Sequence, residues 1–269
     1  MHQPSNRARF LATVAVTAVF ACGLGGCQTM SDITGSISSK TTASAEPDPH
    51  QMAEATGERY RADPKNAEAA LAYGQALRAS GQRSQAAAML EQATIAHPGD
   101  KALLAAYGRA LVDNGNFQQA LDVLSRAHSP ENPDWRILSV QGTALDQLGR
   151  HDEARRYYAS ALKIAPDEPT VLSNLGLSYM LSKNLPKAEE ALRQAYASGK
   201  ADARVRQNLA LVIGLQGRFA EAEQIVRADL PPDEAAANVA YLKQMLSRKD
   251  DQRTAGAGKM PIASLSRPE

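Results

Sequence analysis

The chain has 269 residues, of which 43% are hydrophobic and 5% aromatic, so it can build a packed fold and is not disordered throughout. Its 49 alanines against four phenylalanines favour closely packed helices over a β-sandwich. The 30 basic residues nearly balance the 29 acidic ones, which argues against nucleic-acid binding through a global positive field. Two cysteines cannot form a disulfide framework or a cysteine-rich zinc site.

Residues 1–26 have the pattern of an export signal. Arg7 and Arg9 precede an uncharged, largely apolar stretch over 10–26, as in the positive and hydrophobic regions of a signal peptide. A membrane-spanning helix needs about 20 predominantly apolar residues, and this stretch gives way to glycines before it reaches that length. We therefore expect a removed signal rather than a transmembrane anchor.

The signal ends in Leu-Gly-Gly-Cys at residues 24–27, which resembles the bacterial lipobox. The resemblance implies that Cys27 becomes the lipidated N-terminus of the mature protein. Two alternatives stay open, namely lipidation at Cys22 and ordinary cleavage that leaves Cys27 a free thiol. Several acyl chains hold a protein on its membrane far better than one chain does. In a Gram-negative host, Gln28 in place of the aspartate that retains lipoproteins in the inner membrane implies an outer-membrane anchor facing the periplasm.

The segment that follows Cys27 is rich in small and polar residues and has no apolar periodicity. Residues 27–50 are therefore predicted to be a lipidated flexible tether, which holds the next domain about 25 Å from the lipid on average. At the other end, residues 247–269 mix charges with glycine and proline and are predicted to be a disordered tail. The folded domain is expected over residues 51–246.

Small residues recur every 34 positions through the middle of the chain, which indicates an internal repeat. Because glycine makes up about 7% of average proteins, three further glycines falling in register have chance odds on the order of one in a few thousand. Two alanine series keep the same period. The glycines are Gly74, Gly108, Gly142 and Gly176, and the alanines are Ala86, Ala120, Ala154, Ala188 and Ala222, with Ala93, Ala127, Ala161 and Ala195.

This pattern resembles the tetratricopeptide repeat (TPR) at its small-residue positions, and the resemblance implies an all-α superhelix (α-solenoid) of about five helix-turn-helix repeats. Two helices approach closely only where side chains are tiny, so the periodic glycines are predicted to mark helix crossings. We expect repeats at about 67–100, 101–134, 135–168, 169–202 and 203–230, after an N-terminal half-repeat and before a C-terminal capping helix at 233–246.

The turn inside each repeat also carries a small residue. Glycine suits a left-handed backbone conformation, and asparagine is the next best tolerated residue. The fourth repeat has Lys183-Asn184 where the others have glycine, so Asn184 is expected to adopt the left-handed conformation in that turn. The turn glycines of the other four repeats are Gly81, Gly115, Gly149 and Gly217.

No catalytic motif accompanies the repeats. The chain lacks a phosphate-binding loop, an HExxH pair, a serine or cysteine nucleophile signature, and carboxylates spaced to flank one substrate atom. We therefore expect no enzyme activity, no metal or other cofactor and no small-molecule substrate. The histidines are expected to be solvated residues of the signal, the tether and the turns; they are His2, His50, His97, His128 and His151.

The TPR resemblance implies that the first helix of each repeat lines a peptide-binding groove. Reading the groove positions copy by copy gives polar residues in the first three repeats and asparagines flanked by apolar residues in the last two. The asparagines could bind a peptide backbone or satisfy a neighbouring turn. The leucines beside them could contact a bound peptide or be covered by the C-terminal helix. Both questions stay open. The predicted groove residues are Gln75, Arg78, Arg109, Thr143, Asn174, Leu177, Met180, Asn208 and Leu211.

A more specific resemblance appears in the fifth repeat. Residues 201–211 (ADARVRQNLAL) and 214–222 (GLQGRFAEA), with the DLPP stretch at 229–232 and NVAYL at 238–242, resemble the TadD family of TPR lipoproteins of tight-adherence (Flp, type IVc) pilus assembly. The resemblance implies a pilotin-like assembly factor whose protein or peptide partner is the secretin or another pilus component. The alternative is a lipoprotein scaffold that recruits cell-envelope enzymes acting on peptidoglycan.

Overall fold

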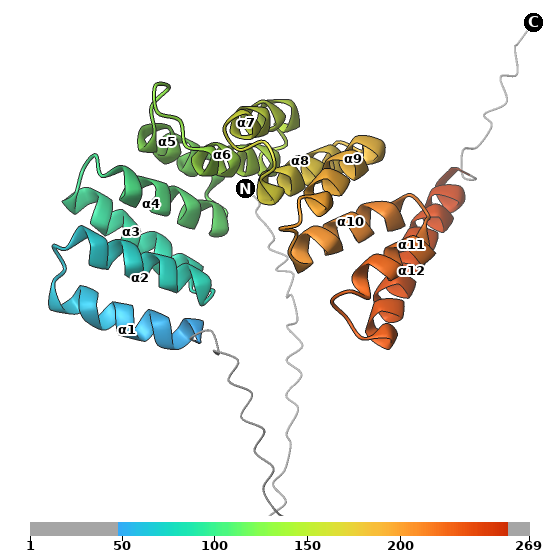
Figure 1. Ribbon diagram of the computed structural model, residues 1–269, viewed down its shortest axis with the longest axis horizontal. Coiled ribbons are helices and arrows are strands. Elements are labelled where there is room, and N and C mark those ends of the chain that lie inside the picture. The colour runs from blue at the N-terminus through green and yellow to red at the C-terminus, as the bar shows by residue number, and fades with distance from the viewer. Residues whose placement is uncertain (1–47, 258–269) are drawn as a thin grey trace, which may run out of the picture. The chain divides into compact units, whose positions relative to one another are not determined.

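The computed structural model describes residues 48–257, whose regular secondary structure consists of twelve α-helices. The helices follow one another as antiparallel pairs (Figure 1), which confirms the predicted all-α repeat fold. The expectations for 1–26, for Cys27 and for most of the tether lie outside the described residues. The helices are α1 (Pro49–Ala62), α2 (Ala67–Ala79), α3 (Arg83–Ala96), α4 (Lys101–Asp113), α5 (Phe117–Ala127), α6 (Trp135–Gln147), α7 (His151–Ile164), α8 (Pro169–Leu181), α9 (Leu185–Ala197), α10 (Ala203–Leu215), α11 (Phe219–Val226) and α12 (Pro232–Ala257).

Side-chain caps fix where the first helix of each pair begins. The Asp100 carboxylate accepts hydrogen bonds from the backbone N–H groups of Ala102 and Leu103 at 2.9 and 3.0 Å. Asp202 accepts in the same way from Val205 at 2.9 Å. Such bonds satisfy donors that have no partner within the helix. The five first helices begin 34 residues apart, at Ala67, Lys101, Trp135, Pro169 and Ala203.

The helices form two layers. The first helices α2, α4, α6, α8 and α10 each contact the next helix of the same series, whereas among the described helices the second helices α3, α5, α7, α9 and α11 contact only the first helices that flank them. Helix α1 packs on α2 as the second half of an incomplete repeat, and α12 packs on α10 and α11. The first helices therefore form one continuous layer.

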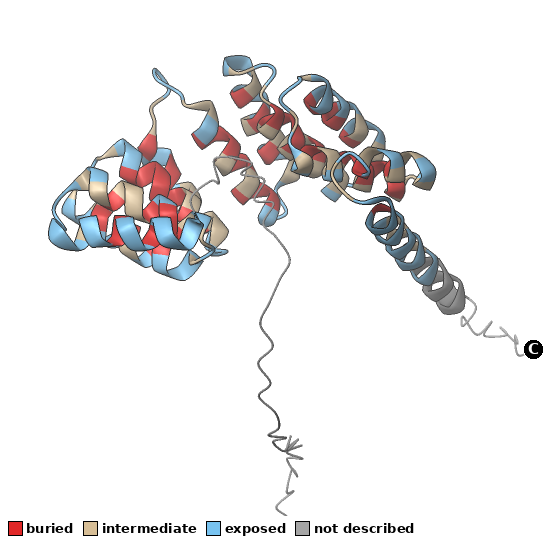
Figure 2. Cartoon of the chain, turned by 60° about the horizontal axis from the view of Figure 1, so that its bottom comes forward, coloured by how far each residue is buried: buried red, intermediate tan, exposed pale blue. Residues whose placement is uncertain are grey.

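The periodic glycines lie where paired helices approach most closely. A Cβ atom built on Gly108 would lie 2.4 Å from Leu124, and one on Gly142 would lie 2.5 Å from the ring of Tyr158. Real Cβ atoms do not approach other heavy atoms so closely, so a residue with a Cβ fits there only if the facing side chain shifts. The alanines Ala120 in α5 and Ala154 in α7 are fully buried, and buried residues line the sides on which the helices pack (Figure 2).

The turn of the fourth repeat differs from the sequence expectation. Gly81, Gly115, Gly149 and Gly217 all have positive φ, between 75° and 83°. In the fourth repeat the left-handed residue is Lys183, at φ 63°, and not Asn184. Asn184 instead caps α9, with its side chain accepting a hydrogen bond from the backbone N–H of Lys187 at 3.3 Å. The expectation for Asn184 was wrong because Lys183, and not Asn184, lies 34 residues from both Gly149 and Gly217 and so occupies the left-handed position of the turn.

Replacing Lys183 by glycine should stabilise the protein. A left-handed conformation costs a residue with a Cβ about 1–2 kcal/mol, and the extra freedom of glycine in the unfolded chain offsets about half of that. We expect Lys183→Gly to raise the free energy of unfolding by about 0.5–1 kcal/mol, measured by urea denaturation. The matched control Lys187→Gly, in the helical backbone of α9, should lower it; a loss of stability at both positions would contradict this explanation.

The C-terminal helix is longer than expected. Helix α12 runs to Ala257, so the predicted helix 233–246 ends too early and the predicted tail begins eleven residues too soon. No proline follows Pro232 until Pro261, and the intervening residues include several good helix formers. None of the described helices combines the length and apolar character needed to cross a membrane.

Candidate peptide-binding surface

The predicted groove residues lie along the layer of first helices, on helices α2, α4, α6, α8 and α10. We call the side of this layer that carries them the first-helix face. Six of the nine line two separate depressions on this face, one more lines a third depression, and two are bonded to neighbouring repeats. The face is therefore a row of distinct sites rather than one uniform groove.

The first depression, of about 340 Å³, lies between α2, α4 and α6. Gln75 and Arg109 line it, as predicted groove residues. Lys101 and Arg136 add two further positive charges, and Asp134 contributes one negative charge. Small side chains, including those of Ala102 and Ala105, leave room above the helices. We call this site the basic depression.

Arg109 is the partly buried cation of the basic depression. Among residues 48–257 no carboxylate lies within ion-pair distance of its guanidinium group. Burial lowers the pKa of Arg109, and the nearby charges of Arg78 and Arg136 lower it further, while Asp134 opposes this. A partly buried charge without a counter-ion is costly. With three cations and one carboxylate among its lining residues, the basic depression carries a net positive charge.

His128 borders the basic depression and is not the solvated turn residue that we expected. One ring nitrogen, Nε2, lies 3.2 Å from Oε1 of Gln141. The other, Nδ1, is buried and has no hydrogen-bond partner in the described part of the chain. His151 also departs from the expectation, because its Nδ1 lies 2.8 Å from the carboxylate of Asp146. Both contacts join residues of different helices or loops, and neither follows from local sequence.

The second depression, of about 200 Å³, lies between α6 and α8. Four predicted groove residues, Thr143, Asn174, Leu177 and Met180, meet there. Leu181, which is 47% exposed, extends the apolar part of its wall. We call this site the apolar notch, because three aliphatic side chains line it.

The two asparagines bond to the preceding first helix and not to a turn. Nδ2 of Asn174 donates to Oγ of Ser139 over 3.1 Å, and Nδ2 of Asn208 donates to Oγ of Ser173 over 3.0 Å. Each contact joins residues 35 positions apart, and the two contacts join α6 to α8 and α8 to α10. Within residues 48–257 neither side-chain carbonyl oxygen accepts a hydrogen bond. Each carbonyl oxygen therefore keeps its capacity to accept a peptide N–H.

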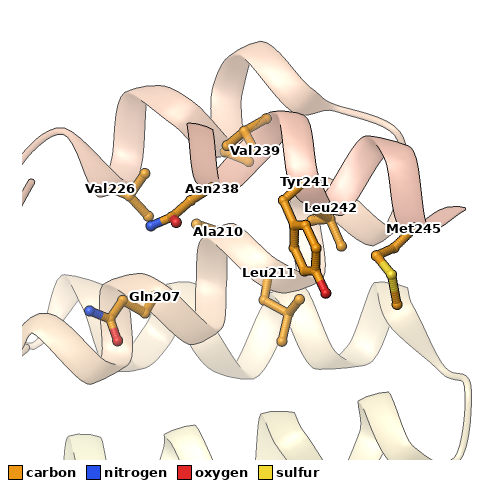
Figure 3. A pocket seen from close by; sticks show the side chains of 10 residues that line it. Gln207, Ala210, Leu211, Val226, Asn238, Val239, Tyr241, Leu242 and Met245 are labelled. Carbon is orange, nitrogen blue, oxygen red and sulfur yellow. The ribbon is translucent and has the colours of Figure 1, made fainter. Parts of the chain in front are cut away.

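Two other predicted groove residues, Arg78 and Leu211, line neither the basic depression nor the apolar notch. Nε of Arg78 donates to the Asp113 carboxylate over 2.6 Å, which joins α2 to α4. Leu211 lines a third depression of about 460 Å³ between α10 and α12, together with Tyr241 and Met245 (Figure 3). Helix α12 thus forms one wall beside Leu211, while it does not line the apolar notch.

A buried polar network in the third repeat was missed by sequence reasoning. The Asp146 carboxylate accepts hydrogen bonds from the hydroxyl groups of Tyr158, at 3.0 Å, and Ser178, at 2.8 Å. Asp146 is only 7% exposed, so its carboxylate serves contacts inside the fold and is not presented to a partner on the groove wall. Burial raises the pKa of Tyr158, and the negative charge of Asp146 adds to this. The network stabilises the α6–α7–α8 packing. Its signal in the sequence is tyrosine at the position where the other clear repeats have leucine.

Sequence profiles described as tetratricopeptide repeat match residues 77–142, 127–169, 139–203 and 203–228. Together they span more than half of the chain, from the end of α2 through α11. No curated protein sequence matches the chain.

Solved structures with a similar fold come from several biological settings. PilW, a widely conserved type IV pilus biogenesis factor, gives a TM-score of 0.62 at 20% identity, over 72% of this chain and 91% of that one. TTC0263, a thermophilic TPR protein of Thermus thermophilus, gives 0.59 at 23% identity, over 66% of this chain and 100% of that one. The APC/C hetero-tetramer Cut9–Hcn1 gives 0.60 at 16% identity, over 73% of this chain and only 40% of that one. At these identities the likeness establishes the fold alone.

Proposed function

Because the chain belongs to the tetratricopeptide repeat family, we propose that it binds a segment of a partner protein along its first-helix face and performs no catalysis. The observation that carries this proposal is Arg109, a partly buried cation without a carboxylate partner in the described residues. A carboxylate of a bound segment would supply the missing counter-ion with a charge-assisted hydrogen bond.

The neighbouring apolar notch suggests what else the segment carries. Leu177 and Met180 offer apolar surface to a side chain, and the free carbonyl oxygen of Asn174 can accept a backbone N–H beside them. We therefore infer a segment that places an acidic side chain at the basic depression and an apolar side chain in the notch. Such contacts are few and partly exposed, so binding should be moderate and reversible.

The finer assignment that we propose is an assembly factor of the tight-adherence pilus. The support is the resemblance of residues 201–222 and 229–242 to the TadD family. PilW, a pilus biogenesis factor, has a similar fold, so solenoids of this kind are used in pilus assembly elsewhere. In this proposal the lipid on Cys27 anchors the chain to the outer membrane, and the first-helix face holds a periplasmic segment of the secretin or another pilus component.

Cysteine variants in the native host test the anchor. Without its lipid the chain loses the membrane affinity that the acyl chains provide. We expect Cys27→Ser to release the protein from outer-membrane fractions and to reduce secretin multimers there, while the matched control Cys22→Ser leaves both unchanged. Secretin multimers are measured by immunoblotting of unheated membrane samples. If secretin assembly is untouched in Cys27→Ser and peptidoglycan enzymes are recovered with the wild-type chain instead, the scaffold function replaces the pilus function.

A further inference from the structure

Helix α12 has 26 residues, whereas each of the five first helices has 13. Its attachment to the array uses one side only. Ala235 is fully buried, and Leu242 lies so close to Gly214 that a Cβ there would be 2.5 Å from it. Over residues 232–248, much of the remaining surface of α12 is exposed (Figure 2). The described part of the chain provides no second helix to cover it.

Next to the side that packs on the array, α12 carries a stripe of five exposed residues, which we call the α12 stripe: Glu234, Ala237, Tyr241, Met245 and Arg248. Their spacings of three, four, four and three positions keep them on one side of an α-helix. Two of them are large and apolar, since Tyr241 is 64% exposed and Met245 is 48% exposed. The stripe borders the depression between α10 and α12, where both side chains point toward the side of Leu211 (Figure 3).

The order of residues in the α12 stripe is symmetric about Tyr241. In two antiparallel helices related by a two-fold axis at Tyr241, positions equally far before and after it face each other. Small Ala237 of one helix then faces large Met245 of the other. Acidic Glu234 likewise faces basic Arg248, at both ends of the contact. The stripe is therefore complementary to itself in size and in charge.

We propose that the α12 stripe is a dimerisation surface and that its occupant is the same stripe of a second copy of this chain, packed antiparallel. Each dimer then contains one contact between the two Tyr241 side chains, two contacts of Ala237 with Met245, and two ion pairs of Glu234 with Arg248. The second helix enters the depression beside Leu211 at the C-terminal end of the array. The basic depression and the apolar notch, between α2 and α8, remain free for a partner segment.

Cysteine crosslinking of the full chain in native membranes tests the dimer. A residue next to a two-fold axis meets its own copy, so Tyr241→Cys should give a covalent dimer at twice the mass of the chain when treated with a short bismaleimide. Two controls are matched to it. Ala236→Cys lies on another side of α12 and is also exposed, and the wild-type chain has the same native cysteines; neither should give that product.

Charge reversal tests the pairing itself. Arg248→Glu places like charges opposite each other twice per dimer, so crosslinking through Tyr241→Cys should fall about tenfold. Adding Glu234→Arg restores opposite charges and should restore the crosslinked product. The proposal is overturned if Tyr241→Cys reacts only with a different protein, if Ala236→Cys reacts equally well, or if the double charge reversal fails to restore the dimer. The stripe shares no residue with the basic depression, so the dimer and the partner-binding proposal can fail separately.

Discussion

Substitution of Gly108 by valine should cost this protein more stability than any exposed substitution. A single Cβ atom on Gly108 would already lie 2.4 Å from two side-chain carbons of Leu124. Helix α4 cannot move away, because α2 and α3 pack on one side of it and α6 on the other. Overpacking a close helix contact costs about 1–3 kcal/mol, and a branched side chain at so short a distance belongs at or above the upper end of that range.

The expected result is therefore a loss of about 3 kcal/mol or more in the free energy of unfolding, measured by urea denaturation followed by circular dichroism. In a repeat array, a loss at one interface uncouples the repeats on its two sides, so the unfolding transition should also broaden or split. Ala79→Val, at an exposed position of α2, is the control and should cost little. Gly108→Ala should be tolerated better in a Leu124→Ala background than alone; strict additivity of the two changes would show that the glycine does not act through Leu124.

Substitution of Arg109 by glutamate should have the largest effect on partner binding. The change replaces the partly buried cation of the basic depression by an anion and repels the acidic side chain that we propose it binds. Loss of a partly buried charge pair weakens binding by at least about 2 kcal/mol, which corresponds to about 30-fold. Partner recovered with the chain from crosslinked membranes, quantified by mass spectrometry, should fall accordingly.

The same substitution separates binding from folding. Arg109 has like charges of Arg78 and Arg136 nearby and no carboxylate partner in the described chain, so its loss should not lower the free energy of unfolding. Arg126→Glu, at an exposed position of α5, is the control and should leave partner recovery unchanged. Equal loss of partner from both variants would show that the basic depression is not a specific site, and unfolding of Arg109→Glu would contradict the expected stability.

The repeat architecture could be predicted from sequence because the two helices of each repeat make their closest contact at the same position of the repeat. Gly108 and Gly142 meet the residue sixteen positions later in the next helix, so one 34-residue period marks every helix crossing. The predicted residues of the basic depression and the apolar notch also come together, since groove positions recur with that period. Whether those residues bind a partner stays a prediction.

The remaining features depend on pairs of residues that no period connects. The hydrogen bond of Ser178 to Asp146 joins two helices at different positions of their repeats, so neither residue alone signals a buried network. The polar contacts of His128 likewise depend on a distant partner, Gln141 in α6. The left-handed Lys183 is different, because it lies in the 34-residue register of Gly149 and Gly217 and could have been predicted from that period.

The central claim is that a partner segment lies on the first-helix face. Site-specific photo-crosslinking in the native host tests it most directly, with a benzophenone amino acid in place of Gln147, an exposed residue that lines the apolar notch, or of Ser160, an exposed residue of α7 in the other layer. We predict that the probe at Gln147 captures a single partner through a segment containing an acidic residue, and that the probe at Ser160 does not. Capture of the same partner from Ser160 and not from Gln147 would contradict the account.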